Sequence, residues 1–186
     1  MLLWIYRKKI KEQMDQRILV LKFGGTSVKD IAAMNKAATL SLEHDFDHVL
    51  VVSSAISGVT NMLVYIADQL KAGNYDIEDK VGEVIDLHTR MGQQLQSSGF
   101  EMEKINQHLQ AFKNLVEKTR RSKNITKSEY ARFPSFGELL STTLLAHIIQ
   151  QKEKSAIWFD VRSILKTDDN YLGIKKFQNL TEFKNL

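Results

Sequence analysis

The stretch that most constrains the fold is residues 18–28, Ile-Leu-Val-Leu-Lys-Phe-Gly-Gly-Thr-Ser-Val. Its short apolar run is typical of a buried strand, and the glycine pair followed by hydroxyl residues predicts a tight loop and a helix start. Gly24 and Gly25 would let the backbone approach an anion closely, and Lys22 would add a positive charge beside it. The pattern is not a Walker loop, because that motif places its lysine after the second glycine. These residues alone leave a phosphate-sized loop and a plain strand-to-helix turn both open.

The same design occurs a second time within the first seventy residues. An amphipathic helix is expected over about 29–44, and the apolar run 49–52 predicts a second strand of the kind that parallel sheets need. The small polar loop 53–61 then leads to a helix over about 62–71. In a parallel sheet both loops lie at the carboxyl ends of strands, where open α/β folds bind ligands. Ser, Thr and Asn are also the residues that a helix start prefers, so a turn with an N-cap stays an alternative.

The middle of the chain is helical. Apolar residues at helical spacing over 76–121, interrupted at Gly99, predict a helical hairpin. A further helix is expected over about 133–151, with Glu138 in its first turns, where the carboxylate either complements the helix dipole or anchors a ligand's ammonium group. Residues 156–159 predict a third strand, and a polar loop is expected at 167–171. Three strands against five or six helices are few for an α/β domain.

Composition limits the function classes. The chain has 186 residues, a formal charge of +4 and no cysteine. This mild charge indicates neither nucleic acid nor a membrane as a partner, and the lack of cysteine excludes disulfides and thiolate metal sites. The histidines show no paired ligand spacing, so no metal site is predicted, and the cytoplasm is the expected compartment. Residues 1–17 are expected to be an extension, either a frayed amphipathic helix or residues that precede a true start at Met14.

Four segments, in order and spacing, resemble aspartate kinases, notably the monofunctional lysine-sensitive type. They are Lys-Phe-Gly-Gly-Thr-Ser-Val at 22–28, Ser-Ala-Ile-Ser-Gly-Val-Thr-Asn at 54–61, Phe-Gly-Glu-Leu-Leu-Ser at 136–141, and Trp-Phe-Asp-Val-Arg at 158–162 with Thr-Asp at 167–168. The resemblance implies an α/β fold, the three-layer α/β/α sandwich of amino-acid kinases, here incomplete and carrying a helical hairpin insertion. It also implies transfer of the γ-phosphoryl group of MgATP to the β-carboxylate of L-aspartate, which gives 4-phospho-L-aspartate for lysine, threonine and methionine biosynthesis.

On the phosphate side, the resemblance assigns roles to the first two loops. Lys22 matches the lysine that contacts the transferring phosphate, and Gly24 and Gly25 match the backbone cradle for ATP. Ser54 matches a position near the reacting groups. Mg²⁺ is implied through the nucleotide, and no metal ligand is identified in this chain.

On the acceptor side, Thr60 and Glu138 match aspartate-binding positions. A carboxylate acceptor has an ordinary pKa of about 4, so it is ionised at neutral pH and needs no general base. Catalysis then reduces to alignment and charge neutralisation, which Lys22, backbone donors and Mg²⁺ can supply. Glu138 suits the α-ammonium group of the substrate rather than proton transfer.

Residues 18–186 cover the N-terminal, acceptor-binding part of such a domain, and residues 172–186 do not clearly match. The adenine-binding half, the later glycine-rich segment and the regulatory ACT domains of the family are missing, so we expect the chain to turn over negligibly alone. The resemblance implies a homo-oligomeric parent. Two alternatives stay open: a related enzyme such as glutamate kinase or acetylglutamate kinase, and a non-catalytic truncated chain that binds anions or intact subunits. A Rossmann-like module is disfavoured, since the chain has no Gly-x-Gly-x-x-Gly.

Overall fold

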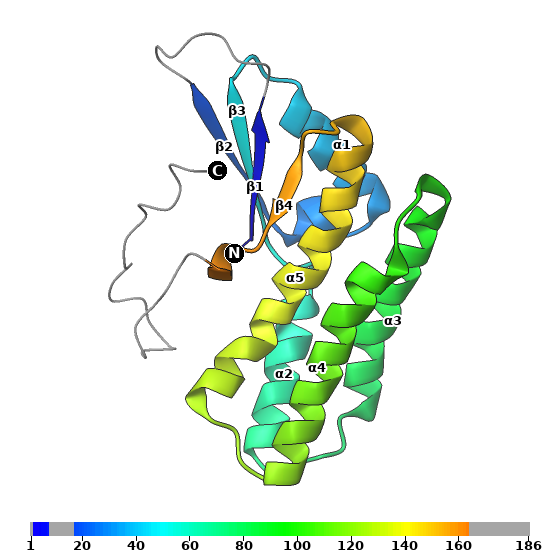
Figure 1. Cartoon of the computed structure of the whole chain (residues 1–186). Coiled ribbons are helices and arrows are strands. Elements are labelled where there is room, and N and C mark those ends of the chain that lie inside the picture. The colour runs from blue at the N-terminus through cyan, green and yellow to red at the C-terminus, as the bar shows by residue number, and fades with distance from the viewer. Residues whose placement is uncertain (1, 8–16, 164–186) are drawn as a thin grey trace.

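The computed structural model describes residues 2–7 and 17–163 (Figure 1). Its four-stranded sheet has the order β2-β3-β1-β4. The strands are β1 (Leu2–Arg7), β2 (Ile18–Phe23), β3 (His48–Ser53) and β4 (Ile157–Phe159). β2 and β3 are parallel, whereas β1 runs antiparallel to both of its neighbours, β3 and β4.

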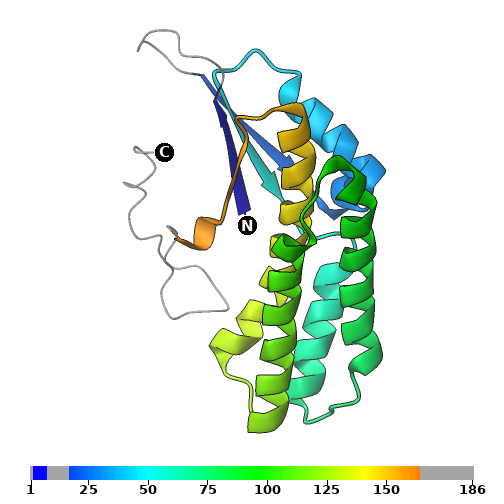
Figure 2. The same ribbon diagram turned by 45° about the vertical axis from the view of Figure 1, so that its right-hand side comes forward.

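Helices cover one face of this sheet and continue past its end as a bundle (Figures 1 and 2). The α-helices are α1 (Ile31–Leu42), α2 (Val59–Lys71), α3 (Glu78–Leu95), α4 (Met102–Ser122) and α5 (Lys127–Lys152). Short 3₁₀ turns occur at η1 (Gly25–Val28), η2 (Gln96–Ser98) and η3 (Val161–Ser163). No helix in the described ranges is long and apolar enough to cross a membrane.

α5 is the central helix of the molecule. It contacts α1, α2, α3 and α4 as well as the sheet, and every residue from Leu139 to Ile149 is buried. A helix that is enclosed on all sides must carry apolar side chains around its whole circumference, or polar side chains that hydrogen-bond within the protein. Its hydroxyl residues meet this condition, since Thr143 Oγ1 donates to the carbonyl oxygen of Leu139 at 2.8 Å. α5 therefore fixes the bundle and the sheet relative to each other.

The alternation of β2 separates the two faces of the sheet. Leu19, Leu21 and Phe23 pack against the main core on the helical side. Ile18 is 62% exposed and Val20 is 57% exposed on the opposite side. This period of two is what the strand geometry requires, and it places any even-numbered residue of β2 away from the helices.

Most elements agree with the sequence expectations. Both loop-helix units are present, and α3 and α4 form the expected hairpin, with the chain reversing at Gly99. The expectation of a helix in the N-terminal extension is wrong for residues 2–7, which form β1 in the sheet. The expected polar loop at 167–171 lies outside the described residues.

The start of α5 is a second correction. The helix begins at Lys127, six residues before the expected position, and continues through Pro134. Thr126 accepts a hydrogen bond from the backbone N–H of Glu129, and the Glu129 carboxylate accepts one from the N–H of Thr126. This reciprocal arrangement is a capping box. Lys118 and the backbone N–H of Thr126 together lower the pKa of Glu129 to about 2.

Candidate functional site

The loops that follow β2 and β3 lie in direct contact. The backbone N–H of Ser54 donates to the carbonyl oxygen of Phe23 at 3.0 Å, and that of Ser57 donates to Gly25 at 3.2 Å. A Cβ atom on Gly25 would lie 2.9 Å from the carbonyl oxygen of Ala55. This distance is too short, and a backbone atom cannot move aside as the end of a side chain can. Glycine at position 25 therefore allows the two loops to touch. This packing is a structural reason for glycine there, in addition to its predicted role in the phosphate cradle.

α5 joins the two loops at the same edge. A Cβ atom on Gly137 would lie 2.6 Å from the Cβ of Ala55, so the helix rests closely on the second loop. The fully buried Ser141 hydroxyl lies 2.8 Å from the carbonyl oxygen of Ser54 and 3.2 Å from that of Glu138. One hydroxyl thus links the backbones of two residues to which the sequence assigned site roles.

Lys22 lies on the sheet face away from the helices. It is exposed at the carboxyl end of β2, opposite Val52 in the register. Its side chain makes no hydrogen bond or ion pair with any described residue, so its charge is available to an anion. A Cβ atom on Gly24 would meet nothing within 4 Å, which leaves open space above the backbone next to this lysine.

The two predicted acceptor residues occupy neighbouring helices. Thr60 is exposed in the first turn of α2, and Glu138 is half-buried on α5. The carboxylate of Glu138 forms no ion pair within the described ranges. Its backbone carbonyl accepts a hydrogen bond from Thr142 Oγ1 at 2.6 Å, and the indole N–H of Trp158 donates to that same hydroxyl at 3.2 Å. The backbone at Glu138 is therefore held from β4 as well as from the second loop.

The structure therefore gathers the predicted residues in part. The backbones of Gly25, Ser54 and Glu138 are joined through loop contacts and the Ser141 hydroxyl. The side chains of Lys22 and Thr60 are exposed near these loops and make no contact with each other or with Glu138 among the interactions of the described residues. In the same residues, no group of three or more His, Asp or Glu side chains could hold a metal ion.

Sequence reasoning missed the packing role of Gly137. The structure also buries Ser141 and leaves Glu138 half-buried. A glycine inside an apolar helical run costs about 1 kcal/mol relative to alanine and so often marks a close contact. That signal was present in the Phe-Gly-Glu segment.

Comparisons with known proteins identify the family of this chain. The signature of the amino acid kinase family matches residues 17–182. Lysine-sensitive aspartokinase 3 of Escherichia coli is 34% identical over 154 residues, which cover 83% of this chain and 33% of that protein. Aspartokinase 3, chloroplastic, of Arabidopsis thaliana is 30% identical over 81% of this chain and 27% of its own length.

Solved structures give the same result. E. coli aspartokinase III in complex with aspartate and ADP superimposes with a TM-score of 0.67 at 30% identity, covering 82% of this chain and 33% of that chain. The complex of that enzyme with lysine and aspartate gives a TM-score of 0.69 at 28% identity, over 84% of this chain and 34% of that one. The chain spans about one third of the length of these relatives. It belongs to the amino acid kinase family and, within that family, resembles the aspartokinases.

Proposed function

We propose that this chain is the acceptor-binding part of an aspartate kinase, which transfers the γ-phosphoryl group of ATP to the β-carboxylate of L-aspartate. The observation that carries the proposal is the meeting of three segments at one edge of the sheet. Gly25 contacts the second loop, and α5 reaches the same loop through Gly137 and Ser141. The carboxyl ends of parallel strands are where α/β folds bind small ligands.

The residues present fit a nucleotide phosphate and an amino-acid acceptor. Lys22 makes no ion pair with any residue that the structure describes, and it lies beside the open backbone at Gly24. MgATP, when bound, supplies the phosphoryl group and neutralises part of its charge. In this proposal Lys22 neutralises the transferring group, while Glu138 and Thr60 hold the acceptor by its ammonium group and by a hydroxyl contact. The acceptor carboxylate is already ionised, so no side chain of this chain needs to remove a proton.

We also propose that the chain turns over negligibly alone and that the parent enzyme is a homo-oligomer of the cytoplasm serving lysine, threonine and methionine biosynthesis. The basis is coverage, since the chain matches about one third of its relatives. Alignment of the acceptor is of little use without a nucleotide held opposite it, because orientation of both reactants supplies much of the rate in such reactions.

The test has two arms. The purified chain is incubated with ATP, Mg²⁺ and aspartate, and the acyl phosphate is trapped with hydroxylamine; we expect no product. The chain is then joined to the portion of E. coli aspartokinase 3 that its match does not cover, and we expect aspartate-dependent turnover. The intact E. coli enzyme is the positive control, and the joined enzyme carrying Lys22→Ala is the negative one.

Each outcome decides between the readings. Product from the chain alone would overturn the inactivity proposal. Turnover of glutamate in preference to aspartate by the joined enzyme would favour glutamate kinase. A joined enzyme that folds and oligomerises but does not turn over would favour the non-catalytic chain that binds anions or intact subunits.

A further inference from the structure

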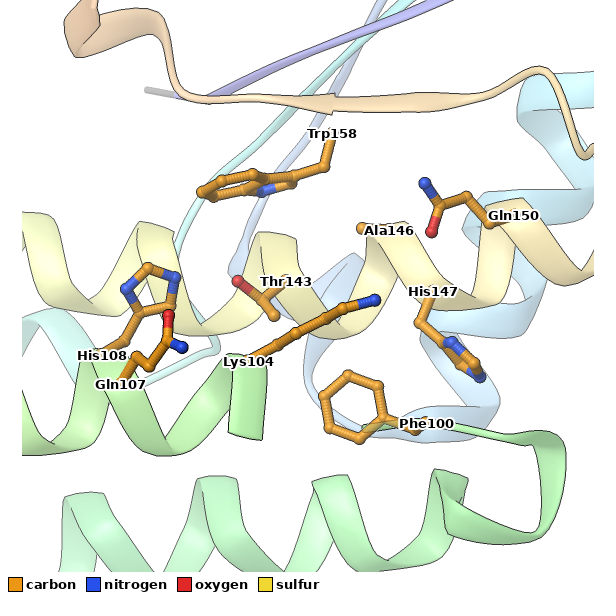
Figure 3. A pocket seen from close by; sticks show the side chains of 9 residues that line it. All are labelled: Phe100, Lys104, Gln107, His108, Thr143, Ala146, His147, Gln150 and Trp158. Carbon is orange, nitrogen blue, oxygen red and sulfur yellow. The ribbon is translucent and has the colours of Figure 1, made fainter. Parts of the chain in front are cut away.

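A cavity of about 290 Å³ lies between α4 and α5, beneath β4 (Figure 3). It is lined by α5 residues from Thr143 onward, beyond the segment that carries Glu138, so it is separate from the site described above. Ala146 lies at its floor, and the Trp158 ring lies across its opposite side. The volume is close to the lower end of the range for ligand pockets, which suits a small molecule.

Four of the nine residues that line the cavity carry aromatic rings. Trp158 is held by its indole hydrogen bond to Thr142, and its ring centre lies 5.9 Å from that of His108. At the other end Phe100 and His147 meet edge to face, with ring centres 5.2 Å apart. One ring of each pair is held by a hydrogen bond, Trp158 by Thr142 and His147 by Ser98, so these two rings are oriented before any ligand arrives. Flat apolar faces of this kind favour an aromatic guest.

The charge around the cavity favours an anion. Lys104 extends along the cavity in Figure 3, with its side chain 58% exposed, and its ammonium group lies 3.2 Å from Glu101, which is 70% exposed. An ion pair as exposed as this one contributes little to the stability of the fold, so a ligand carboxylate can replace Glu101 as the partner of Lys104. Asp160 is engaged by Arg162 at 2.6 Å, and Lys154 lies close enough to His147 to act on its charge. Among the charged groups that act on the two histidines, three are cations and two are anions.

The two histidines add rings rather than charge. Burial, reinforced by Arg162, lowers the pKa of His108. Burial, reinforced by Lys104 and Lys154, lowers the pKa of His147. Both imidazoles are consequently neutral at pH 7, which leaves Lys104 as the cation among the lining residues.

We propose that this cavity binds a small aromatic monocarboxylate, with its ring between Trp158 and Phe100 and its carboxylate on Lys104. A dianion is disfavoured by the single cation, and an aliphatic acid lacks the flat surface that the ring walls fit. The site does not depend on the proposed kinase activity, and its test uses binding alone.

The test is a titration of the ¹⁵N-labelled chain with benzoate, observed at the indole N–H of Trp158. The chain has two tryptophans, and Trp4→Phe assigns the signal. We expect a saturable shift with a dissociation constant of the order of 1 mM, as suits so small a ligand. Benzamide, which has the aromatic ring without the charge, and cyclohexanecarboxylate, which has the charge on a saturated ring without a flat aromatic face, are each expected to bind about tenfold more weakly.

Lys104→Met is expected to weaken benzoate binding about tenfold and to leave benzamide binding unchanged. Lys113→Met, on the same helix but lining a different surface, is the matched control and should change neither. Ala146→Leu fills the floor and should abolish the shift with both ligands, with its fold checked by circular dichroism. Equal binding of benzoate and benzamide, equal effects of the two lysine variants, or no shift at Trp158 with 20 mM benzoate (about twenty times the expected constant) would each overturn the proposal.

Discussion

Gly137→Ala tests how closely α5 rests on the second loop. The added Cβ would lie 2.6 Å from the Cβ of Ala55 and 3.3 Å from side-chain atoms of Leu63 and Val59. The methyl group of Ala55 is attached directly to the backbone and cannot rotate away. The variant can therefore fold only if the loop or the helix moves.

The magnitude follows from two opposing terms. Overpacking a close-packed site costs about 1–3 kcal/mol, and a contact this short belongs at the upper end of that range. Replacing a helical glycine by alanine returns about 1 kcal/mol. The net loss in the free energy of unfolding is thus about 2 kcal/mol. Gly82→Ala in α3 is the matched control, because a Cβ there meets nothing within 4 Å and the variant should gain about 1 kcal/mol.

Urea unfolding followed by far-UV circular dichroism measures both variants. In a chain of this size 1 kcal/mol corresponds to about 2–4 °C in Tm, so thermal unfolding should separate Gly137→Ala from Gly82→Ala by several degrees. Adding Ala55→Gly to Gly137→Ala removes the clashing methyl and should restore part of the loss. A Gly137→Ala protein as stable as the wild type, or a double variant no better than the single one, would refute the reasoning.

Four further outcomes are expected. His88 is buried, its Nε2 has no hydrogen-bond partner within the described structure, and burial lowers its pKa from 6.5 to about 4. As the pH falls, the imidazole is therefore protonated in the unfolded chain before it is protonated in the folded one. The free energy of unfolding should fall by up to about 3 kcal/mol between pH 6.5 and pH 4. His88→Leu should flatten that part of a plot of urea midpoint against pH, and an unchanged slope would contradict this. Thr126→Ala removes the cap that pairs with Glu129 and should lower the free energy of unfolding by about 1 kcal/mol, whereas no change in midpoint would argue against the capping box. In the joined enzyme, Lys22→Ala should reduce kcat strongly. Near-wild-type turnover would instead indicate that the loop after β2 is only a strand-to-helix turn and does not bind phosphate. Glu138→Gln should raise the KM for aspartate about 10–100-fold, as expected for the loss of a charged hydrogen bond, and an unchanged KM would remove Glu138 from the acceptor site.

The parts of the fold that have a local signal could be predicted from the sequence. The alternating and continuous apolar runs gave β2 and β3, and helical spacing gave α3 and α4. The start of α5 had a local signal too, the capping box of Thr126 and Glu129, which lies before the expected start at residue 133. β1 was missed although its residues 2–6 are apolar and include two aromatic rings, because its partners β3 and β4 are distant in sequence and nothing local indicates the antiparallel pairing.

Some features of the candidate site could be predicted from the sequence in the same way, and others could not. The meeting of the two loops followed from the rule that parallel strands present their carboxyl ends at one edge. The Ser141 hydroxyl that spans Ser54 and Glu138 could not be foreseen, since it depends on how deeply α5 is buried. The exposure of Lys22 follows from the alternation of side chains along β2, once it is known that the helices cover the face of Leu19, Leu21 and Phe23.

The antiparallel β1 ties the two ends of the described chain together during folding. Leu3 lies opposite Phe159, so this contact closes a loop of roughly 150 residues, a slow and entropically costly event. Among the described strands, β4 has no neighbour other than β1. β1 therefore gains β4 as its second partner only after residues 157–159 have been synthesised. The docking of β4, and with it the seating of Trp158 over α5, should be among the last steps of folding.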